Sequence, residues 1–226
     1  MAKTYSIAID GPAGAGKSTM AKTLAKELGF YYVDTGAIYR TVAYFMDLLG
    51  VSPKDADGVE RYIDELTIHI EYDEEGKQHM LMNGMDVTDE IRTQDISQKA
   101  SLVSAHPVVR DVLLDMQRDV AKAHNVIMDG RDIGTVVLPK ADVKIFLTAT
   151  PEVRAKRRTD ELLNKGQKAE YEVVLKEIQQ RDYQDTHRPI APLKMARDSV
   201  KLDTSELDIE GVLAAMKKII GEKIPV

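Results

Sequence analysis

The sequence predicts an α/β domain built on a five-stranded parallel sheet with helices on both faces. Three observations support this prediction. Short apolar runs of strand length alternate with longer runs of helical periodicity. The first strand leads through a glycine-rich loop into a helix. One segment, about 62–92, instead alternates apolar and polar residues between turn residues, which predicts a small inserted antiparallel sheet.

The composition of the 226-residue chain suits one soluble domain, because 43% of its residues are hydrophobic and 30% are charged. No apolar run approaches the roughly 18 residues of a membrane span, and a strand begins too early to leave room for a signal peptide. The chain has no cysteine, so we expect a cytoplasmic protein without disulfides. The net charge of −6 argues against broad nucleic-acid binding. With no obvious interface stripe, we expect a monomer.

The first strand and helix flank the glycine-rich loop. Residues 5–10 form a short apolar run typical of a buried strand. After the loop, apolar residues recur at fourfold spacing on one side of a helix, at Met20, Leu24 and Leu28. Gly29 then suits the helix C-cap. Strand, glycine loop and helix are the context that a phosphate-binding loop requires.

Residues 11–18 of this loop read G-x-x-x-x-G-K-S. In such a loop the backbone N–H groups turn inward, and the helix N-terminus adds partial positive charge. We predict that Lys17 reaches the β- and γ-phosphates of a nucleoside triphosphate and that the Ser18 hydroxyl holds Mg²⁺ directly. The residues predicted to bind ATP here are Gly11, Pro12, Ala13, Gly14, Ala15, Gly16, Lys17, Ser18 and Thr19.

A second strand over 30–33 ends at Asp34 and leads into another helix, which Gly50 and Pro53 end. The predicted inner face of this helix comprises Tyr39, Val42, Ala43 and Met46. Thr35 and Arg40 lie at the carboxyl end of the strand, where parallel sheets form their binding crevice. On the residues alone, a solvated surface charge explains Arg40 equally well.

The inserted segment begins with Ile68, Ile70 and Tyr72, which alternate with polar residues. A turn over 73–77 and a strand with Met80 and Met82 follow, and Asn83-Gly84 is a strong hairpin turn before residues 85–87. The insert is either a structural addition without a role in the reaction or a mobile subdomain on the substrate side of the protein.

Two helices are predicted over about 92–105 and 107–123, with Ser101 on the first and Arg110 on the second. On the residues alone, each of these side chains is more often on the surface than in a site. The next strand ends in Asp129, which is placed to orient Mg²⁺ through water. The loop that follows carries the adjacent charges Arg131 and Asp132 between glycines, which favours a functional role.

A fourth strand over 143–147 precedes a helix with Thr150 as N-cap and Pro151 in its first turn. Residues 151–190 are rich in basic side chains, and arginines match phosphate oxygens two at a time. We predict a helical hairpin that closes over the triphosphate, although a solvated face explains some of these charges. A last strand over 200–203 leads into a C-terminal helix that begins at Thr204 or Ser205. Its predicted inward residues are Ile209, Val212, Leu213, Met216 and Ile219.

Together these features resemble the nucleoside monophosphate kinases, which have a P-loop kinase fold, and most closely the bacterial cytidylate kinases. Matching runs lie at residues 9–18, 34–40 and 129–137, and in the basic segment at 181–193. The resemblance runs essentially from end to end and includes the inserted sheet. Its one departure is Thr35, where many members carry serine; we expect the hydroxyl contact to survive.

The resemblance implies transfer of a phosphoryl group from ATP, with Mg²⁺, to CMP or dCMP. It implies an acceptor-binding region over 35–105 and a lid over 151–190. Catalytic roles fall to Lys17, Arg131, Arg181 and Arg188, and an ATP contact to Arg157. Acceptor-phosphate contacts fall to Thr35, Arg40 and Arg131, base contacts to Ser101, Arg110 and Asp132, and lid and sugar contacts to Arg181, Asp185 and Arg188.

Other functions remain open at this point. The same fold could act on UMP, AMP or shikimate, although residues 130–132 and the insert favour cytidylate. A nucleotide-dependent switch would carry a guanine-recognition motif such as N-K-x-D. The closest run, Asn164-Lys165-Gly166-Gln167, lacks the final acid.

Overall fold

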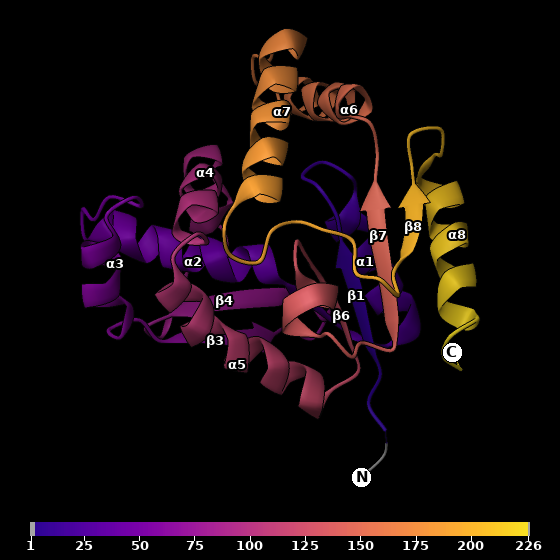
Figure 1. The fold of residues 1–226 in the computed structure, drawn as a ribbon, viewed down its shortest axis with the longest axis horizontal. Helices are drawn as coiled ribbons and strands as arrows, with labels where there is room; N and C mark the ends of the chain where they lie inside the picture. Colours follow the sequence, from indigo (N-terminus) through magenta and orange to yellow (C-terminus); the bar gives the residue numbers. More distant parts are fainter. Residues whose placement is uncertain (1–2, 226) are drawn as a thin grey trace.

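The main sheet has five parallel strands in the order β2-β6-β1-β7-β8, in a computed structural model that describes residues 3–225 (Figure 1). The strands are β1 (Ser6–Asp10), β2 (Tyr31–Asp34), β6 (Val126–Gly130), β7 (Val143–Thr148) and β8 (Val200–Asp203). In this register Asp129 lies beside both Ile9 of β1 and Asp34 of β2. The α/β prediction is confirmed, and the carboxyl ends of β1, β2 and β6 meet at one edge.

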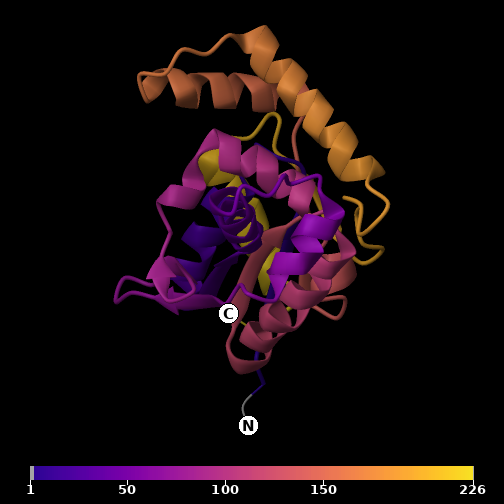
Figure 2. The ribbon, with the colours of Figure 1, turned by 90° about the vertical axis from the view of Figure 1, so that its left-hand side faces the viewer.

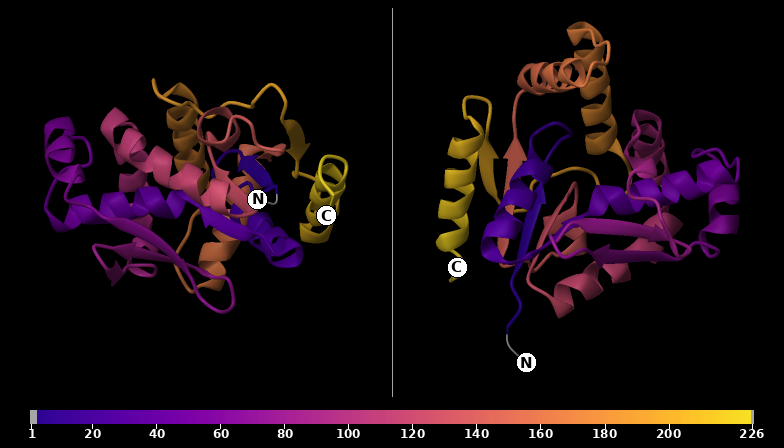
Figure 3. Two further views of the ribbon diagram at one scale, coloured as in Figure 1. Left: turned by 90° about the horizontal axis from the view of Figure 1, so that it is seen from below. Right: turned by 180° about the vertical axis from the view of Figure 1, so that it is seen from behind.

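Alternating side chains of β1 build two hydrophobic cores, one on each face of the sheet. Ile7 and Ile9 pack with α1 (Lys17–Leu28) and α8 (Ile209–Gly221). Ala8 packs on the other face with α2 (Thr35–Leu48) and α5 (Pro107–Ala123). Seen from behind, α8 lies beside the strands (Figure 3). The predicted helix cap at Gly29 is confirmed, with φ 66°.

The C-terminal helix begins later than predicted. Its N-cap is Asp208, whose side chain accepts from Gly211 N, rather than Thr204 or Ser205. Ile209 therefore occupies the first turn and is 67% exposed, so its predicted inward position is wrong. The buried residues, at fourfold spacing, are Val212, Met216 and Ile220.

The inserted antiparallel sheet is confirmed, with the strand order β3-β4-β5. Its strands are β3 (Ile68–Tyr72), β4 (Gln78–Met82) and β5 (Met85–Asp86). A helix that the sequence did not predict, α3 (Ala56–Ile63), precedes it and is capped by Asp55. Met80, Met82 and Ile63 belong to the same core as α2, so the insert packs on the main body.

Polar contacts made by Gln78 and Tyr72 fasten the insert to β2. The side chain of Gln78 accepts from Asp34 N at 2.7 Å, and Tyr72 donates its hydroxyl to Tyr32 O at 2.9 Å. Gln78 is buried. The insert therefore supports the point where β2 passes into α2.

Gln78→Met should destabilise the protein by about 1–3 kcal/mol, because the N–H of Asp34 loses its acceptor in a buried place. Urea unfolding measures this loss. The matched control, Gln94→Met, changes an exposed glutamine and should leave the free energy of unfolding nearly unchanged. Equal stability of the two variants would contradict this role of Gln78.

The remaining helices surround the carboxyl edge of the sheet. The predicted helix over 92–105 is a short 3₁₀ turn, η1 (Glu90–Arg92), followed by α4 (Gln94–Val103). A single π-helical turn, η2 (Ile133–Val137), follows β6. The hairpin of α6 (Pro151–Asn164) and α7 (Tyr171–His187) arches over this edge and away from the sheet (Figures 1 and 2). Within residues 3–225, no helix combines the length and apolar character needed to cross a membrane.

Candidate active site

The phosphate-binding loop lies between β1 and α1, against the end of β7. Gly11 has φ 149°, and a Cβ there would lie 1.9 Å from Leu147 O, so only glycine permits this approach. Lys17 is buried and donates from Nζ to Pro12 O at 2.7 Å. Burial, and then the charge of Arg131, lower the pKa of Lys17 to about 7. Without a ligand, burial therefore disfavours the charged form of Lys17, and a bound anion would stabilise that form.

Ser18 and Asp129 meet at the end of the loop. The Ser18 hydroxyl donates to Asp129 Oδ2 at 2.8 Å, and Tyr32 donates to Asp129 Oδ1 at 2.7 Å. Burial, and then the nearby charge of Asp34, raise the pKa of Asp129. In the described part of the chain, no three His, Asp or Glu side chains gather as a complete metal site. A hydroxyl and one carboxylate instead fit Mg²⁺, which takes its other ligands from phosphates and water.

The start of α2 carries the predicted Thr35 and Arg40. Thr35 donates its hydroxyl to Asp129 O at 2.7 Å, beside the loop after β6. Arg40 Nη2 pairs with Asp34 Oδ2 at 2.9 Å, while Asp34 also caps α2 by accepting from Ala37 N. Arg40 Nε is buried and has no hydrogen-bond partner among residues 3–225. Arg40 is therefore held at the site by Asp34, with its buried Nε–H group free to meet a ligand.

The loop after β6 is fixed from beneath by Asp10, which the sequence did not single out. The Asp10 carboxylate is buried and accepts from Ile133 N at 2.8 Å and from Gly134 N at 2.7 Å. Burial raises the pKa of Asp10 to about 6. Above this loop, Arg131 Nε donates to Asp185 Oδ2 of α7 at 2.7 Å. The end of β1 and helix α7 thus hold the loop from two sides.

Asp132 lies between two arginines from different elements. Arg110 of α5 pairs with Asp132 Oδ2, and Arg188, just after α7, approaches Asp132 Oδ1 at 3.4 Å. Arg110 also donates to Ser104 O, and the Ser104 hydroxyl donates to Ser101 O. The three residues predicted to read a base are thus in one neighbourhood, but the Asp132 carboxylate is already engaged by guanidinium groups.

Arg181 completes a group of basic side chains that face one another. Burial, and then the charge of Arg131, lower the pKa of Arg181 to about 10, and Arg40 adds to the effect. Arg181 Nε is buried without a hydrogen-bond partner in the described residues. Arg131 likewise lowers the pKa of Lys17. Burial and the charge of Arg131 thus disfavour the charged forms of Lys17 and Arg181, a cost that a bound anion would relieve.

Two arginines of α6 make hydrogen bonds that the sequence did not predict. Arg157, predicted to contact ATP, donates to Thr204 Oγ1 at 3.1 Å and to Thr204 O at 2.7 Å, and its role toward ATP stays a prediction. Arg154, which lies in the same basic run and received no role, is 2% exposed and donates to Ala13 O of the phosphate-binding loop at 3.0 Å. The residue pattern alone does not distinguish two arginines three positions apart.

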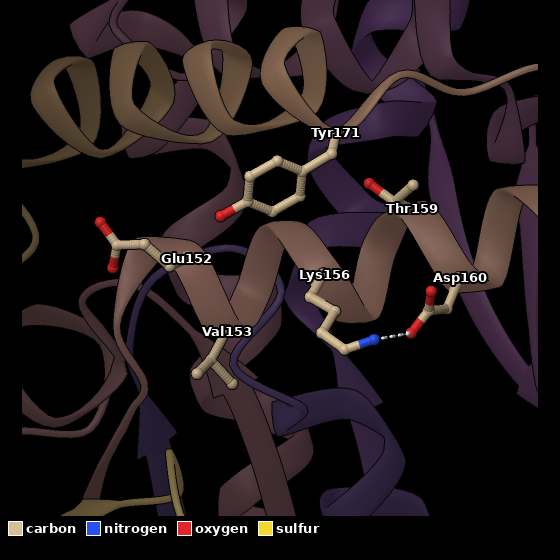
Figure 4. A pocket seen from close by; sticks show the side chains of 6 residues that line it. All are labelled: Glu152, Val153, Lys156, Thr159, Asp160 and Tyr171. Atoms are coloured by element: carbon tan, nitrogen blue, oxygen red, sulfur yellow. Dashed lines mark hydrogen bonds and ion pairs between the residues drawn. The ribbon is translucent and has the colours of Figure 1, made fainter.

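A hollow of about 460 Å³ lies in the α6–α7 hairpin rather than in this crevice (Figure 4). Tyr171 of α7 lies over the face of α6 that carries Thr159, and Lys156 pairs with Asp160 at 3.2 Å (Figure 4). Its acids, Glu152 and Asp160, outnumber its one base. This lining does not suit a triphosphate, so the phosphate-binding loop remains the candidate nucleotide site.

Comparison with known proteins of similar sequence shows the family to which this chain belongs. The profile of the family described as cytidylate kinase matches residues 7–222. The cytidylate kinase of Carboxydothermus hydrogenoformans is 50% identical over 217 residues, which cover 96% of this chain and 97% of that protein. The cytidylate kinase of an Exiguobacterium species is 47% identical over 222 residues, which cover 98% and 99%. A solved structure of an uncharacterized Eubacterium ventriosum protein covers 96% of this chain and 99% of its own at a TM-score of 0.52 and 14% identity, a likeness of fold alone. The chain belongs to the cytidylate kinase family.

Proposed function

We propose that the protein transfers the γ-phosphoryl group of ATP to CMP or dCMP, with ADP and CDP or dCDP as products. The observation that carries this proposal is the group of cations formed by Lys17, Arg131 and Arg181, in which burial and then the charge of Arg131 lower the pKa values of Lys17 and Arg181. A donor triphosphate and an acceptor monophosphate are the anions that such a group of cations suits.

On the donor side, the backbone of residues 11–18 would hold the phosphates, and Lys17 would turn from Pro12 O to the γ-phosphate. Ser18 would hold Mg²⁺ directly and Asp129 through water. When bound, Mg²⁺ neutralises charge on the phosphate oxygens. The pairing of Ser18 with Asp129 supports this assignment, because their oxygens already face each other.

On the acceptor side, Thr35, Arg40 and Arg131 would hold the monophosphate, and Arg181, Asp185 and Arg188 would contact the sugar and the transferred group. Ser101, Arg110 and Asp132 would read the cytosine. Asp132 supplies a carboxylate that can accept from the exocyclic amine with lone pairs that its arginines leave free. An acceptor phosphate oxygen is already a nucleophile, so transfer needs alignment and charge stabilisation rather than a general base.

We further propose that residues 35–105 form the acceptor-binding region and residues 151–190 a lid. Closing both over the nucleotides would exclude water, which otherwise would take the phosphoryl group. The protein is proposed to act as a monomer in the cytoplasm.

The test is ADP production from ATP and Mg²⁺ with CMP, dCMP, UMP, AMP, GMP or no acceptor in parallel reactions. We expect turnover with CMP and dCMP far above every other reaction. Equal rates with all acceptors would remove the base assignment, and hydrolysis that ignores the acceptor would overturn the kinase assignment.

Binding of Mg·ATP at pH 8 should take up close to one proton. The pKa of Lys17 is about 7 in the free protein, so most of the population is neutral at pH 8, and contact with phosphate oxygens raises this pKa. Calorimetry in two buffers of different ionisation heat measures the uptake. Lys17→Met should abolish it, whereas a binding heat independent of the buffer in the natural protein would contradict the assignment.

A further inference from the structure

The α6–α7 hairpin has a small hydrophobic cluster of its own. Ala155 of α6 packs with Val174 and Ile178 of α7, apart from the two cores that cover the sheet. Apolar packing therefore holds the two helices to each other. Polar contacts on the inner side of α7 connect it with the loops beneath.

One of these contacts is a clasp, the ion pair that the buried Arg154 makes with Asp182 of α7. Its guanidinium donates to Asp182 of α7 from Nη1 at 2.9 Å and from Nη2 at 2.5 Å, a two-bond arrangement. The same group donates to Ala13 O at 3.0 Å and to Ala149 O at 2.9 Å. A Cβ added to Gly14 would lie 3.4 Å from Arg154 Cβ, so the side chain also packs on the loop itself. Arg154 thus joins the donor loop to α7.

Beyond Asp182, the side chains of α7 and of the residue that follows it contact the loop after β6, which is predicted to bind the acceptor. Asp182, Asp185 and Arg188 follow at spacings of three, which places them on neighbouring parts of one helix face. Asp185 pairs with Arg131, and Arg188 approaches Asp132. One end of this face therefore contacts the donor loop through Arg154, and the other end contacts the loop predicted to bind the acceptor.

We propose that Arg154 and Asp182 are positioning residues that transmit occupancy of the donor loop to the acceptor site through α7. Phosphates that fix the loop around Ala13 also fix the Arg154 guanidinium, and through Asp182 they fix the helix that carries Arg181 and Asp185. The acceptor then meets a site whose arginines are already in place, and it binds more tightly. This inference rests on the proposed function.

The test measures the Kd of CMP by calorimetry, with and without a saturating non-hydrolysable ATP analogue and Mg²⁺. In the natural protein we expect the analogue to tighten CMP binding about fivefold or more. Arg154→Lys keeps the positive charge but cannot make both hydrogen bonds to Asp182. Asp182→Asn keeps the shape of the side chain but removes its negative charge. In each variant the ratio of the two Kd values should fall towards one, while CMP alone binds within about twofold of the natural protein.

Matched controls come from exposed ion pairs of α6. Arg158→Lys changes an arginine that pairs with Glu161, and Asp160→Asn changes an acid that pairs with Lys156; neither pair contacts the donor loop. Both controls should keep the natural ratio. Because Arg154 is buried, thermal unfolding of every variant is measured alongside, and the two clasp variants check each other.

The outcomes separate the two proposals. A ratio that is one in the natural protein, or that survives both clasp substitutions, would overturn the coupling while the kinase assignment stands. If Arg154→Lys binds the ATP analogue more weakly, and this weaker binding fully accounts for the lower ratio of CMP Kd values, Arg154 is a direct ATP ligand. That result would overturn its positioning role. Failure of the natural protein to bind CMP at all would overturn the proposed function and this inference with it.

Discussion

Lys17→Ala should lower kcat/KM by roughly three orders of magnitude with the fold intact. Lys17 lies at the start of α1, and its ammonium group can follow the charge that moves between the donor and acceptor oxygens. Among residues 3–225, its ammonium group donates a hydrogen bond only to Pro12 O. Since burial of its charge already lowers its pKa to about 7, the substitution removes an unfavourable group from the free protein and should not unfold it.

The measurement is the steady-state rate with CMP as acceptor, together with thermal unfolding. Lys26→Ala is the control, because Lys26 lies on the same helix but is exposed. It should retain natural turnover. Near-natural turnover of Lys17→Ala would remove this lysine, and with it the donor side of the site, from the proposed mechanism.

Asp132→Asn should lower kcat/KM for CMP by about a hundredfold and bring the CMP-to-UMP ratio close to one. The carboxylate accepts from the amine that cytosine has and uracil lacks. The change also leaves the buried Arg110 without its charge partner, which costs on the order of 3 kcal/mol of stability. Thermal unfolding therefore accompanies the kinetics.

The ratio distinguishes base reading from general damage. Asp185→Asn is the matched control, because Asp185 also pairs with an arginine of the site, Arg131, but is assigned to the sugar side. It should lower the rates with CMP and UMP alike. If Asp132→Asn lowers both rates equally and keeps the natural ratio, base recognition lies elsewhere and Asp132 only holds Arg110 and Arg188.

The strands and loops were predictable because their causes are local. An apolar run such as 126–128 is stable only when it is buried. Gly11 is required because the backbone of Leu147 lies so close that no side chain would fit. The glycine-flanked charges Arg131 and Asp132 follow such a run directly, so their place at the carboxyl edge follows from the strand. The family resemblance supplied the roles of these residues.

Pairings between distant elements were not predictable. Nothing near Asp34 indicates that Gln78, 44 positions later, provides the acceptor for its backbone N–H. An acid at the end of a strand, such as Asp10, gives no local sign of its partners. Its carboxylate accepts from Ile133 N and Gly134 N only because β1 pairs in parallel with β6. These contacts depend on the order of the strands in the sheet, which a local sequence pattern does not predict.

The order of the main sheet also determines when it can form during synthesis. In the described chain, β2 pairs with β6, and β1 lies between β6 and β7, so Ser6 finds its neighbour only at Val126. A ribosome adding about 5–20 residues per second needs on the order of ten seconds to reach that point. The hairpin of β3 and β4 closes within a few residues and can form while the apolar β1 still waits. Until Val126 has been synthesised, the nascent chain therefore carries a strand with no partner, and we expect it to depend on chaperones most strongly in that interval.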